Sequence, residues 1–372
     1  MIVAEYMDPP PKVPGTQGEL LRNADMSGFT SWRAGGKADR LYTPADLADL
    51  CAFLKTLDAS EPVYFIGLGS NLLVRDGGLR GTVIHLHGAL RRIDLEQRRV
   101  NNPHARNTDS LPTQQVDAEF VSAKALTTSL PPEGAQSPPW DGPATDRNGS
   151  DTPSPFGVIF AEAGVASPKV ASFAATHDLA GAEFLAGIPG SVGGALAMNA
   201  GCYGHETWEF VSQVLAVDRR GEIHRRSPKE YQVSYRHVEL EADANGELPA
   251  SDEWFVAAWF RFPRGDGAQA RTDTRQLLEK RIASQPLNLP NAGSVFRNPP
   301  GDFAARLIES CGLKGEKQGG AQVSEKHANF IVNLGGASAA DIEGLIEKVQ
   351  AKVEAKTGIK LVCEVRIVGV RL

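Results

Sequence analysis

The segment that decides the fold is residues 187–201, which reads GIPGSVGGALAMNAG. A second glycine-rich stretch, residues 64–73, reads YFIGLGSNLL and opens with a short run of strand formers. Glycine lets the main chain approach a ligand closely, so both loops can present backbone N–H groups to a pyrophosphate. Each loop alone is more typical of a dense structural turn. Two of them, each next to a strand or helix start, favour a nucleotide cofactor bound between two subdomains.

The loop at 64–73 does not match the common nucleotide fingerprints. Leu72 occupies the third glycine position of G-x-G-x-x-G, and no crossover helix clearly follows it. The Gly-Lys-Ser/Thr ending of a P-loop is absent from the chain. The sequence therefore predicts neither a dinucleotide-binding Rossmann unit nor a P-loop.

Length and charge limit the function further. The chain has 372 residues, enough for two or three domains. Its net charge of −6 argues against a nucleic-acid partner, since such proteins usually carry a basic surplus. No run of 18 apolar residues and no secretory signal is visible, so no membrane partner is expected.

The cysteines indicate a reducing environment. Cys51, Cys202, Cys311 and Cys363 stand alone, which disfavours a zinc site or a disulfide framework. Buried thiols in a cytoplasmic protein are the expectation. No His, Cys and Asp cluster has metal-ligand spacing, so no metal is expected. We also expect a monomer.

The order of helices and strands predicts an α+β protein. Residues 1–20 are proline-rich and are expected to form a flexible tail. A helix is expected to begin at Thr43, with Thr43 as its cap and Pro44 in its first turn. Residues 101–155 are rich in proline and polar residues, so we expect a disordered insertion between strands at 92–100 and 157–162.

The later elements follow clearer periodic patterns. The expected strands are a hairpin at 211–218 and 222–226, a strand at 255–262 and a last strand at 360–370. A helix is expected from Ser167 to His177, followed by a helical stretch before 282 and a helix at 303–311 that buries Phe303. A further helix is expected from the capping box Ser338-x-x-Asp341 to Gly358.

Six separated motifs, in their order along the chain, resemble the UDP-N-acetylenolpyruvoylglucosamine reductase family. They are the two glycine-rich loops, SYR at 234–236, AGSVFRNP at 292–299 after Gln285-Pro286, GGAQVSEKHANF at 319–330, and CEV at 363–365. The match runs from about residue 23 to 369 without the insertion. The chain resembles the family's shorter type, because residues 262–281 leave no room for an extra loop that brings a tyrosine over the substrate.

The resemblance implies a two-subdomain FAD-binding module of the vanillyl-alcohol-oxidase type and a smaller α+β C-terminal substrate domain. The expected first subdomain is 21–90, completed by the strand at 360–372. The second is 91–262 with the insertion, and the substrate domain is 263–359. Non-covalent FAD and NADPH, as electron donor, are the implied cofactors.

The family motifs also imply which residues bind FAD. Those in the first loop are Tyr64, Gly67, Leu68, Gly69, Ser70 and Asn71. Those in the second segment are Gly187, Ile188, Pro189, Gly190, Ser191, Gly193, Gly194, Asn199, Ala200 and Gly201.

The implied reaction reduces an enolpyruvyl ether of UDP-N-acetylglucosamine to a lactyl ether, in peptidoglycan precursor synthesis. Arg236 is expected to stabilise the charge that develops on the substrate, because a guanidinium can bind a carboxylate bidentately. Ser294 is expected to protonate the carbon, and Glu364, ionised or protonated, to face the enolate carboxylate. The alternatives are a surface arginine, a turn serine bonded to its own backbone, and a solvated Glu364–Arg366 ion pair.

Other polar residues are assigned to the UDP-sugar substrate. Arg297, which stands where the family more usually has lysine, is expected to contact it with Asn298, Gln322 and Asn329. Lys314 and Lys317 are more typical of solvated loop residues, and they stay unassigned. His327 is expected to be a core histidine rather than a ligand.

Two other functions stay open from the sequence. A different FAD-dependent oxidoreductase on the same fold often tethers its flavin to His or Cys. His85 and His87 lie outside the glycine run, so a tether is not expected. A non-catalytic nucleotide-sugar binding protein would be expected to lack Arg236, Ser294 or Glu364, and all three are present.

Overall fold

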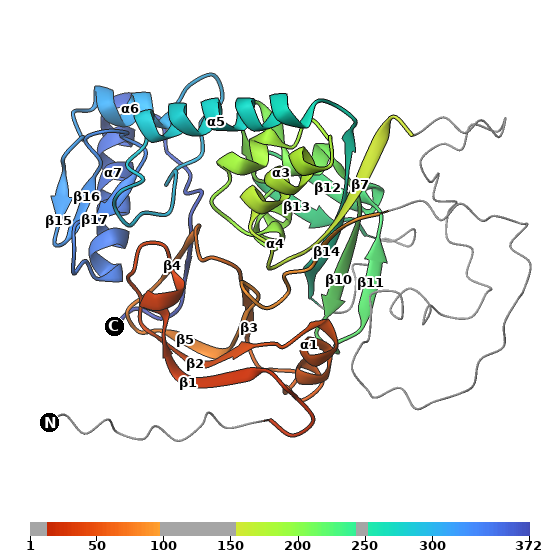
Figure 1. Cartoon of the computed structure of the whole chain (residues 1–372). Helices are drawn as coiled ribbons and strands as arrows, with labels where there is room; N and C mark the ends of the chain where they lie inside the picture. Colours follow the sequence, from red (N-terminus) through yellow and green to blue (C-terminus); the bar gives the residue numbers. More distant parts are fainter. Residues whose placement is uncertain (1–12, 97–153, 243–251) are drawn as a thin grey trace, which may run out of the picture.

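The computed structural model describes residues 13–96, 154–242 and 252–372, which form three parts (Figure 1). The first part contains a four-stranded sheet in the order β1 (Glu19–Asp25), β2 (Lys37–Thr43), β5 (Leu79–His85) and β3 (Val63–Ile66). Strand β1 is antiparallel to β2, while β2 and β3 both run parallel to β5. Helix α1 (Leu47–Leu54) buries Leu50 and Phe53 against this sheet.

The C-terminus returns to the first part. Strand β18 (Arg366–Val368) pairs in parallel with β4 (Leu72–Val74). Within residues 360–372, which were expected to complete the first subdomain, the strand holds three residues.

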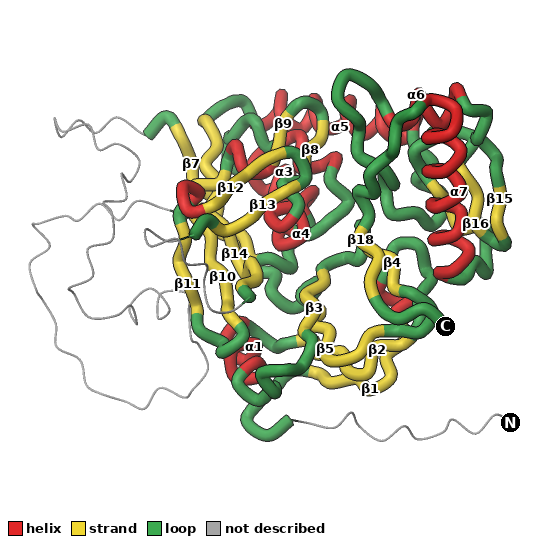
Figure 2. The backbone as a smooth tube through the Cα atoms, turned by 180° about the vertical axis from the view of Figure 1, so that it is seen from behind, coloured by secondary structure: helices red, strands yellow, loops and turns green. Residues whose placement is uncertain are grey.

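The second part is a five-stranded antiparallel sheet. Its order is β11 (Ile223–Arg226), β10 (Val211–Asp218), β14 (Glu253–Pro263), β7 (Phe156–Glu162) and β6 (Ile93–Leu95). Helix α4 (Val192–Ala197) packs on β7 and β14, and α3 (Ser167–Thr176) packs on α5 (Gly267–Ser284). A hairpin of β12 (Tyr231–Ser234) and β13 (His237–Leu240) extends from this part toward the centre of the molecule (Figure 2).

The third part holds helices α6 (Ala304–Ser310) and α7 (Ala339–Thr357) and a small sheet. The sheet order is β15 (Lys317–Gln318), β16 (Ala321–Val323) and β17 (Ile331–Asn333). The expected capping box of Ser338 and Asp341 is present, and α7 ends at Gly358 with φ 73°. The remaining short elements are η1 (Met26–Phe29), η2 (Glu183–Gly187), β8 (Gly201–Cys202), β9 (His205–Glu206), η3 (Thr207–Glu209) and η4 (Pro228–Glu230).

Several expected boundaries are corrected. Helix α1 is capped by Asp46, whose carboxylate accepts a hydrogen bond from Asp49 N, and not by Thr43. Phe303 is 66% exposed because it precedes α6 as its N-cap, so its side chain lies off the buried face. Of the expected tail at 1–20, residues 1–12 lie outside the described residues, and β1 begins at Glu19.

The expected domain boundary at 263 also falls too early. Helix α5 packs on η2 and α3, which belong to the second part. The apolar core of the third part begins with Ala292 and extends to Val365. The insertion expected at 101–155 lies almost wholly outside the described residues. No helix in the described ranges is long and apolar enough to cross a bilayer.

Candidate active site

The two glycine-rich loops meet in space, although more than a hundred residues separate them. A Cβ at Gly67 would collide with Ser191 Oγ, and a Cβ at Gly190 would lie 3.4 Å from Ser70 Oγ. Gly69 has φ 62°, and a Cβ there would collide with Phe29 O. Close packing therefore requires glycine at Gly67 and Gly69.

The first loop keeps its backbone donors free. Within the described ranges, no N–H group of residues 67–71 donates a hydrogen bond to the protein, and neither do those of Gly190 and Ser191. Strand β3 ends at Ile66 and β4 begins at Leu72, so the donors do not belong to a ladder. Clustered main-chain N–H groups without partners fit an anionic pyrophosphate. The residues present therefore suit the diphosphate of a dinucleotide cofactor.

Three expected cofactor residues make contacts that hold the protein together. Asn71 Nδ2 donates to Glu364 O at 3.1 Å, and Asn71 O accepts from Arg366 N at 3.0 Å. Asn199 Nδ2 donates to Glu206 Oε2 at 2.6 Å, and the Asn199 side chain is buried. A Cβ at Gly187 would press on Cys202 Sγ at 2.5 Å. These residues shape the site, while Tyr64, Leu68, Ile188, Pro189, Gly193, Gly194 and Ala200 lie on the same two segments.

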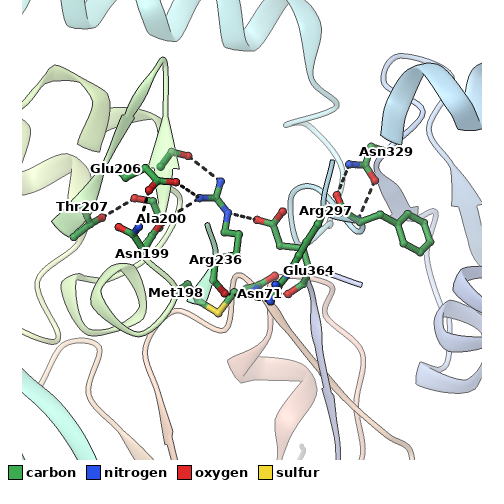
Figure 3. Close-up of polar contacts among 12 residues, drawn as sticks. Asn71, Met198, Asn199, Ala200, Glu206, Thr207, Arg236, Arg297, Asn329 and Glu364 are labelled. Atoms are coloured by element: carbon green, nitrogen blue, oxygen red, sulfur yellow. Dashed lines mark hydrogen bonds and ion pairs between the residues drawn. The ribbon is translucent and has the colours of Figure 1, made fainter. Parts of the chain in front are cut away.

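Arg236 lies at the tip of the β12–β13 hairpin, with φ 57°. Its Nε donates to Glu364 Oε1 at 2.8 Å, and its terminal nitrogens donate to Asn199 O at 3.1 Å and Gly201 O at 3.2 Å (Figure 3). The Arg236 side chain is only 14% exposed. The reading of Arg236 as a surface arginine is therefore wrong.

Glu364 belongs to the segment that precedes β18. Its carboxylate pairs with Arg236, and its side chain is 15% exposed. The alternative Glu364–Arg366 pair is absent from the described interactions, where Arg366 Nε instead lies 3.4 Å from Met198 Sδ. Glu364 therefore joins the second flavin segment and the hairpin tip to the C-terminal strand.

Ser294 precedes a three-residue segment that is bonded on both sides. Val295 N donates to Asn329 O at 2.9 Å, and Glu364 N donates to Val295 O at 2.8 Å. Phe296 and Cys363 form an antiparallel bridge. Ser294 is thus held one residue away from a direct contact with the Glu364 backbone. Among described residues its hydroxyl has no hydrogen-bond partner, so it is not a serine bonded to its own turn.

Arg297 is the last residue of this segment, and its side chain reaches the same hairpin. Its Nη2 donates to Arg236 O at 3.2 Å. Its Nε is buried and has no hydrogen-bond partner among the residues that the structure describes. A buried guanidinium N–H of this kind is available to a hydrogen-bond acceptor such as water or a ligand.

The side chains of the other expected substrate residues differ in how many hydrogen bonds they already make within the protein. Asn298 Oδ1 accepts from Ala304 N at 3.1 Å and so helps begin α6. Gln322 Nε2 lies 3.4 Å from Gly315 O. Asn329 is 3% exposed, and both of its side-chain polar atoms bond to Phe296.

His327 agrees with the core reading. Its Nδ1 accepts from Asn329 N at 3.3 Å, and its ring meets the Phe330 ring edge-on. Burial lowers the pKa of His327. Lys314 pairs with Glu309 at 2.8 Å, as a solvated loop lysine would.

Sequence reasoning missed Glu206. Its Oε1 lies 4.0 Å from Arg236 Nη1, and its Oε2 accepts from Asn199. The signal available was its place five residues after the second flavin segment, but nothing in the sequence shows that β9 turns back onto Asn199.

Comparison with known proteins agrees with this geometry. A family model described as "FAD binding domain" matches residues 155–227, so the fold and site define an FAD-binding protein. A second, described as "UDP-N-acetylenolpyruvoylglucosamine reductase, C-terminal domain", matches residues 285–368.

Relatives of known name extend the match to nearly the whole chain. The UDP-N-acetylenolpyruvoylglucosamine reductase of Thiobacillus denitrificans is 53% identical, covering 96% of this chain and 94% of that protein. The one from Nitrosospira multiformis is 49% identical, covering 95% and 90%. The crystal structure of the Thermus caldophilus enzyme aligns with a TM-score of 0.64 at 26% identity, covering 95% of this chain and 99% of that one. The chain belongs to the UDP-N-acetylenolpyruvoylglucosamine reductase family, and the resemblance of its six motifs is confirmed.

Proposed function

We propose that this protein reduces the enolpyruvyl ether of UDP-N-acetylglucosamine to UDP-N-acetylmuramate, with bound FAD and with NADPH as the donor. The observation that carries the proposal is the Arg236–Glu364 pair, which lies where both glycine-rich loops and the Ser294 segment meet. The proposal is supported by the preorganised Arg236 guanidinium, which could bind an anion next to the loops that would hold the cofactor.

The two loops would hold FAD without a covalent bond. The free N–H groups of residues 67–71, with those of Gly190 and Ser191, would bind its diphosphate. When bound, FAD would supply the hydride-transfer chemistry between the nicotinamide donor and the substrate. The protein's own residues orient the substrate, exclude water and provide a proton.

Arg236 would stabilise the developing enolate. Its guanidinium has five N–H groups, and three of them donate in this structure. Two remain on the terminal nitrogens for the substrate carboxylate. Because Glu364 and two carbonyls fix the guanidinium in advance, it does not reorganise as charge develops.

Ser294 would deliver the proton to the carbon next to the attacked one. Its hydroxyl is half-buried and has no described partner, so it can turn toward the substrate. Arg297, with its unpaired Nε, and the adjacent Asn298 and Gln322 would bind the phosphates or sugar.

A different flavin oxidoreductase is the second candidate, and His85 bears on it. His85 ends β5, opposite Ile66 at the base of the first loop. Burial and the neighbouring His87 lower the pKa of His85 to about 4, and its ring packs on Phe29. A neutral imidazole packed on an aromatic ring favours a structural role over a flavin tether.

The test is an anaerobic stopped-flow measurement on the full chain. The purified protein should be yellow, NADPH should bleach the flavin, and enolpyruvyl-UDP-N-acetylglucosamine should restore the colour. Acid precipitation should release the FAD. A protein without flavin, or one that only dioxygen reoxidises, would contradict the proposal. We further propose that it acts as a cytoplasmic monomer, which light scattering and cell fractionation would check.

A further inference from the structure

We propose that Asn329 is a positioning residue that sets the orientation of Ser294 toward the Arg236–Glu364 pair. The inference rests on the proposed function and adds a residue that does not touch the reacting atoms. It is based on the Asn329 side-chain amide, which forms hydrogen bonds with the backbone of the serine segment, residues 294–297, as a neighbouring β-strand would.

The Asn329 amide brackets the backbone of Phe296. Phe296 N donates to Asn329 Oδ1 at 3.0 Å, and Asn329 Nδ2 donates to Phe296 O at 2.8 Å. One residue earlier, Val295 N donates to the Asn329 carbonyl at 2.9 Å. Three hydrogen bonds therefore fix the two residues that follow Ser294.

The opposite edge of the same segment is bonded to the Glu364 strand. Val295 O accepts from Glu364 N at 2.8 Å, and Arg297 N donates to Val362 O at 2.8 Å. The serine segment therefore lies between two other segments of the chain, one that carries Asn329 and one that carries Glu364. A shift of the Asn329 edge would move Ser294 relative to Glu364 and Arg236.

Only an amide satisfies both Phe296 groups. Asn329 is 3% exposed, so water cannot replace a lost partner easily. An aspartate keeps the acceptor for Phe296 N but sets a carboxylate oxygen against Phe296 O. Catalytic groups depend on placement within fractions of an ångström, so a small displacement of Ser294 is costly.

Asn333 offers a matched control in the same part of the fold. It is 5% exposed, and its Oδ1 accepts from Gly335 N at 2.8 Å and Ala337 N at 3.1 Å. Its Nδ2 donates to Trp32 O at 2.9 Å. The change Asn333→Asp therefore removes the same kind of buried donor without touching the serine segment.

The experiment compares N329D and N333D in the two halves of the reaction. N329D should slow flavin reoxidation by the enolpyruvyl substrate at least tenfold, with flavin reduction by NADPH within twofold of wild type. The substrate concentration that half-saturates reoxidation should change less than threefold. N333D should keep both rates within twofold, even where its Tm falls as much as that of N329D.

Reoxidation of N329D within twofold of wild type would overturn the inference. An equal loss in N333D would also overturn it, because a general loosening would then explain both. N329A is measured in parallel, and retained flavin with normal NADPH reduction identifies the folded variants. If wild type itself fails to reoxidise with the substrate, the proposed function fails, and that outcome is distinct.

Discussion

Arg236 combines a strained backbone conformation with a side chain that is held by several hydrogen bonds. Its φ of 57° lies in a region that side-chain-bearing residues seldom adopt, and Asn199, with φ 40°, shares this feature nearby. The Asn199 carbonyl accepts from Arg236, and the Asn199 side chain is locked by Glu206. The strained backbone is therefore held by polar contacts that also aim the guanidinium.

Replacing Arg236 by lysine should show how much of its effect comes from positive charge and how much from the arrangement of its hydrogen bonds. Lysine keeps a positive charge but cannot bond Glu364, Asn199 O and Gly201 O together while keeping two donors for a carboxylate. We expect flavin reoxidation by the substrate to fall about 10²–10³-fold, with reduction by NADPH nearly unchanged. Stopped-flow absorbance measures both rates.

Arg261→Lys is the control for this change. The Arg261 guanidinium lies over the Phe156 ring at 3.9 Å, on the second sheet, away from the Arg236–Glu364 pair. Its reoxidation rate should stay within twofold of wild type. A similar loss in both variants would show that guanidinium loss acts through general stability.

Local elements were predicted well from the sequence, and long-range contacts were not. The capping box of α7 and the hairpin of β10 and β11 depend on residues close in sequence, and both are present. The Asn71–Glu364 bond and the β4–β18 pair join residues nearly 300 positions apart, and no periodicity encodes them. The family motifs pointed to Ser294, Arg236 and Glu364, but the two hydrogen bonds between the Asn329 side chain and the Phe296 backbone are seen only in the structure.

The meeting of the two loops gives a prediction for Gly67. In Gly67→Ala, the added Cβ would collide with Ser191 Oγ and push the loops apart. We expect FAD affinity to fall at least tenfold, measured by flavin fluorescence on titration of the apoprotein.

Gly28→Ala is the matched control for the loop. A Cβ at Gly28 meets no atom of the described residues within 4 Å, and Gly28 lies in η1. Its FAD affinity should stay within twofold of wild type. Unchanged affinity in Gly67→Ala would contradict the close contact of the loops.

At the scale of the whole molecule, the third part is joined tightly to the first. Asp76 accepts from Ala339 N at 2.9 Å and Ala340 N at 2.8 Å, at the start of α7. Arg75 forms an ion pair with Glu343 at 2.8 Å, and Trp32 Nε1 donates to Ile331 O at 2.8 Å. The segment carrying Ser294 is therefore held against the sheet that carries the first loop.

The Arg75–Glu343 ion pair between the first and third parts should make the stability of the protein depend on pH in the acid range. Hydrogen bonding from Arg75 lowers the pKa of Glu343 below its ordinary 4.5. The stabilisation is present above pH 4.5 and is lost as pH falls through the lower folded-state pKa, because the unfolded state binds the proton more readily. The free energy of unfolding should fall in that window by no more than about 1.4 kcal/mol per pH unit from this group.

The variant Glu343→Gln should flatten this acid dependence, measured by urea unfolding between pH 3 and 6, roughly the window around the carboxyl pKa. Glu347→Gln is the control, since Glu347 is exposed and pairs only with Arg371 among described residues. An acid dependence equally steep in Glu343→Gln and wild type would contradict the assignment.

The most direct test of the account is single-turnover flavin reoxidation in Ser294→Ala. The protein is first reduced by NADPH without oxygen and then mixed with enolpyruvyl-UDP-N-acetylglucosamine. The account predicts reduction at the wild-type rate and reoxidation slowed more than a hundredfold, because alanine removes the hydroxyl that is proposed to donate the proton. Reoxidation within tenfold of wild type would show that Ser294 is not the proton donor.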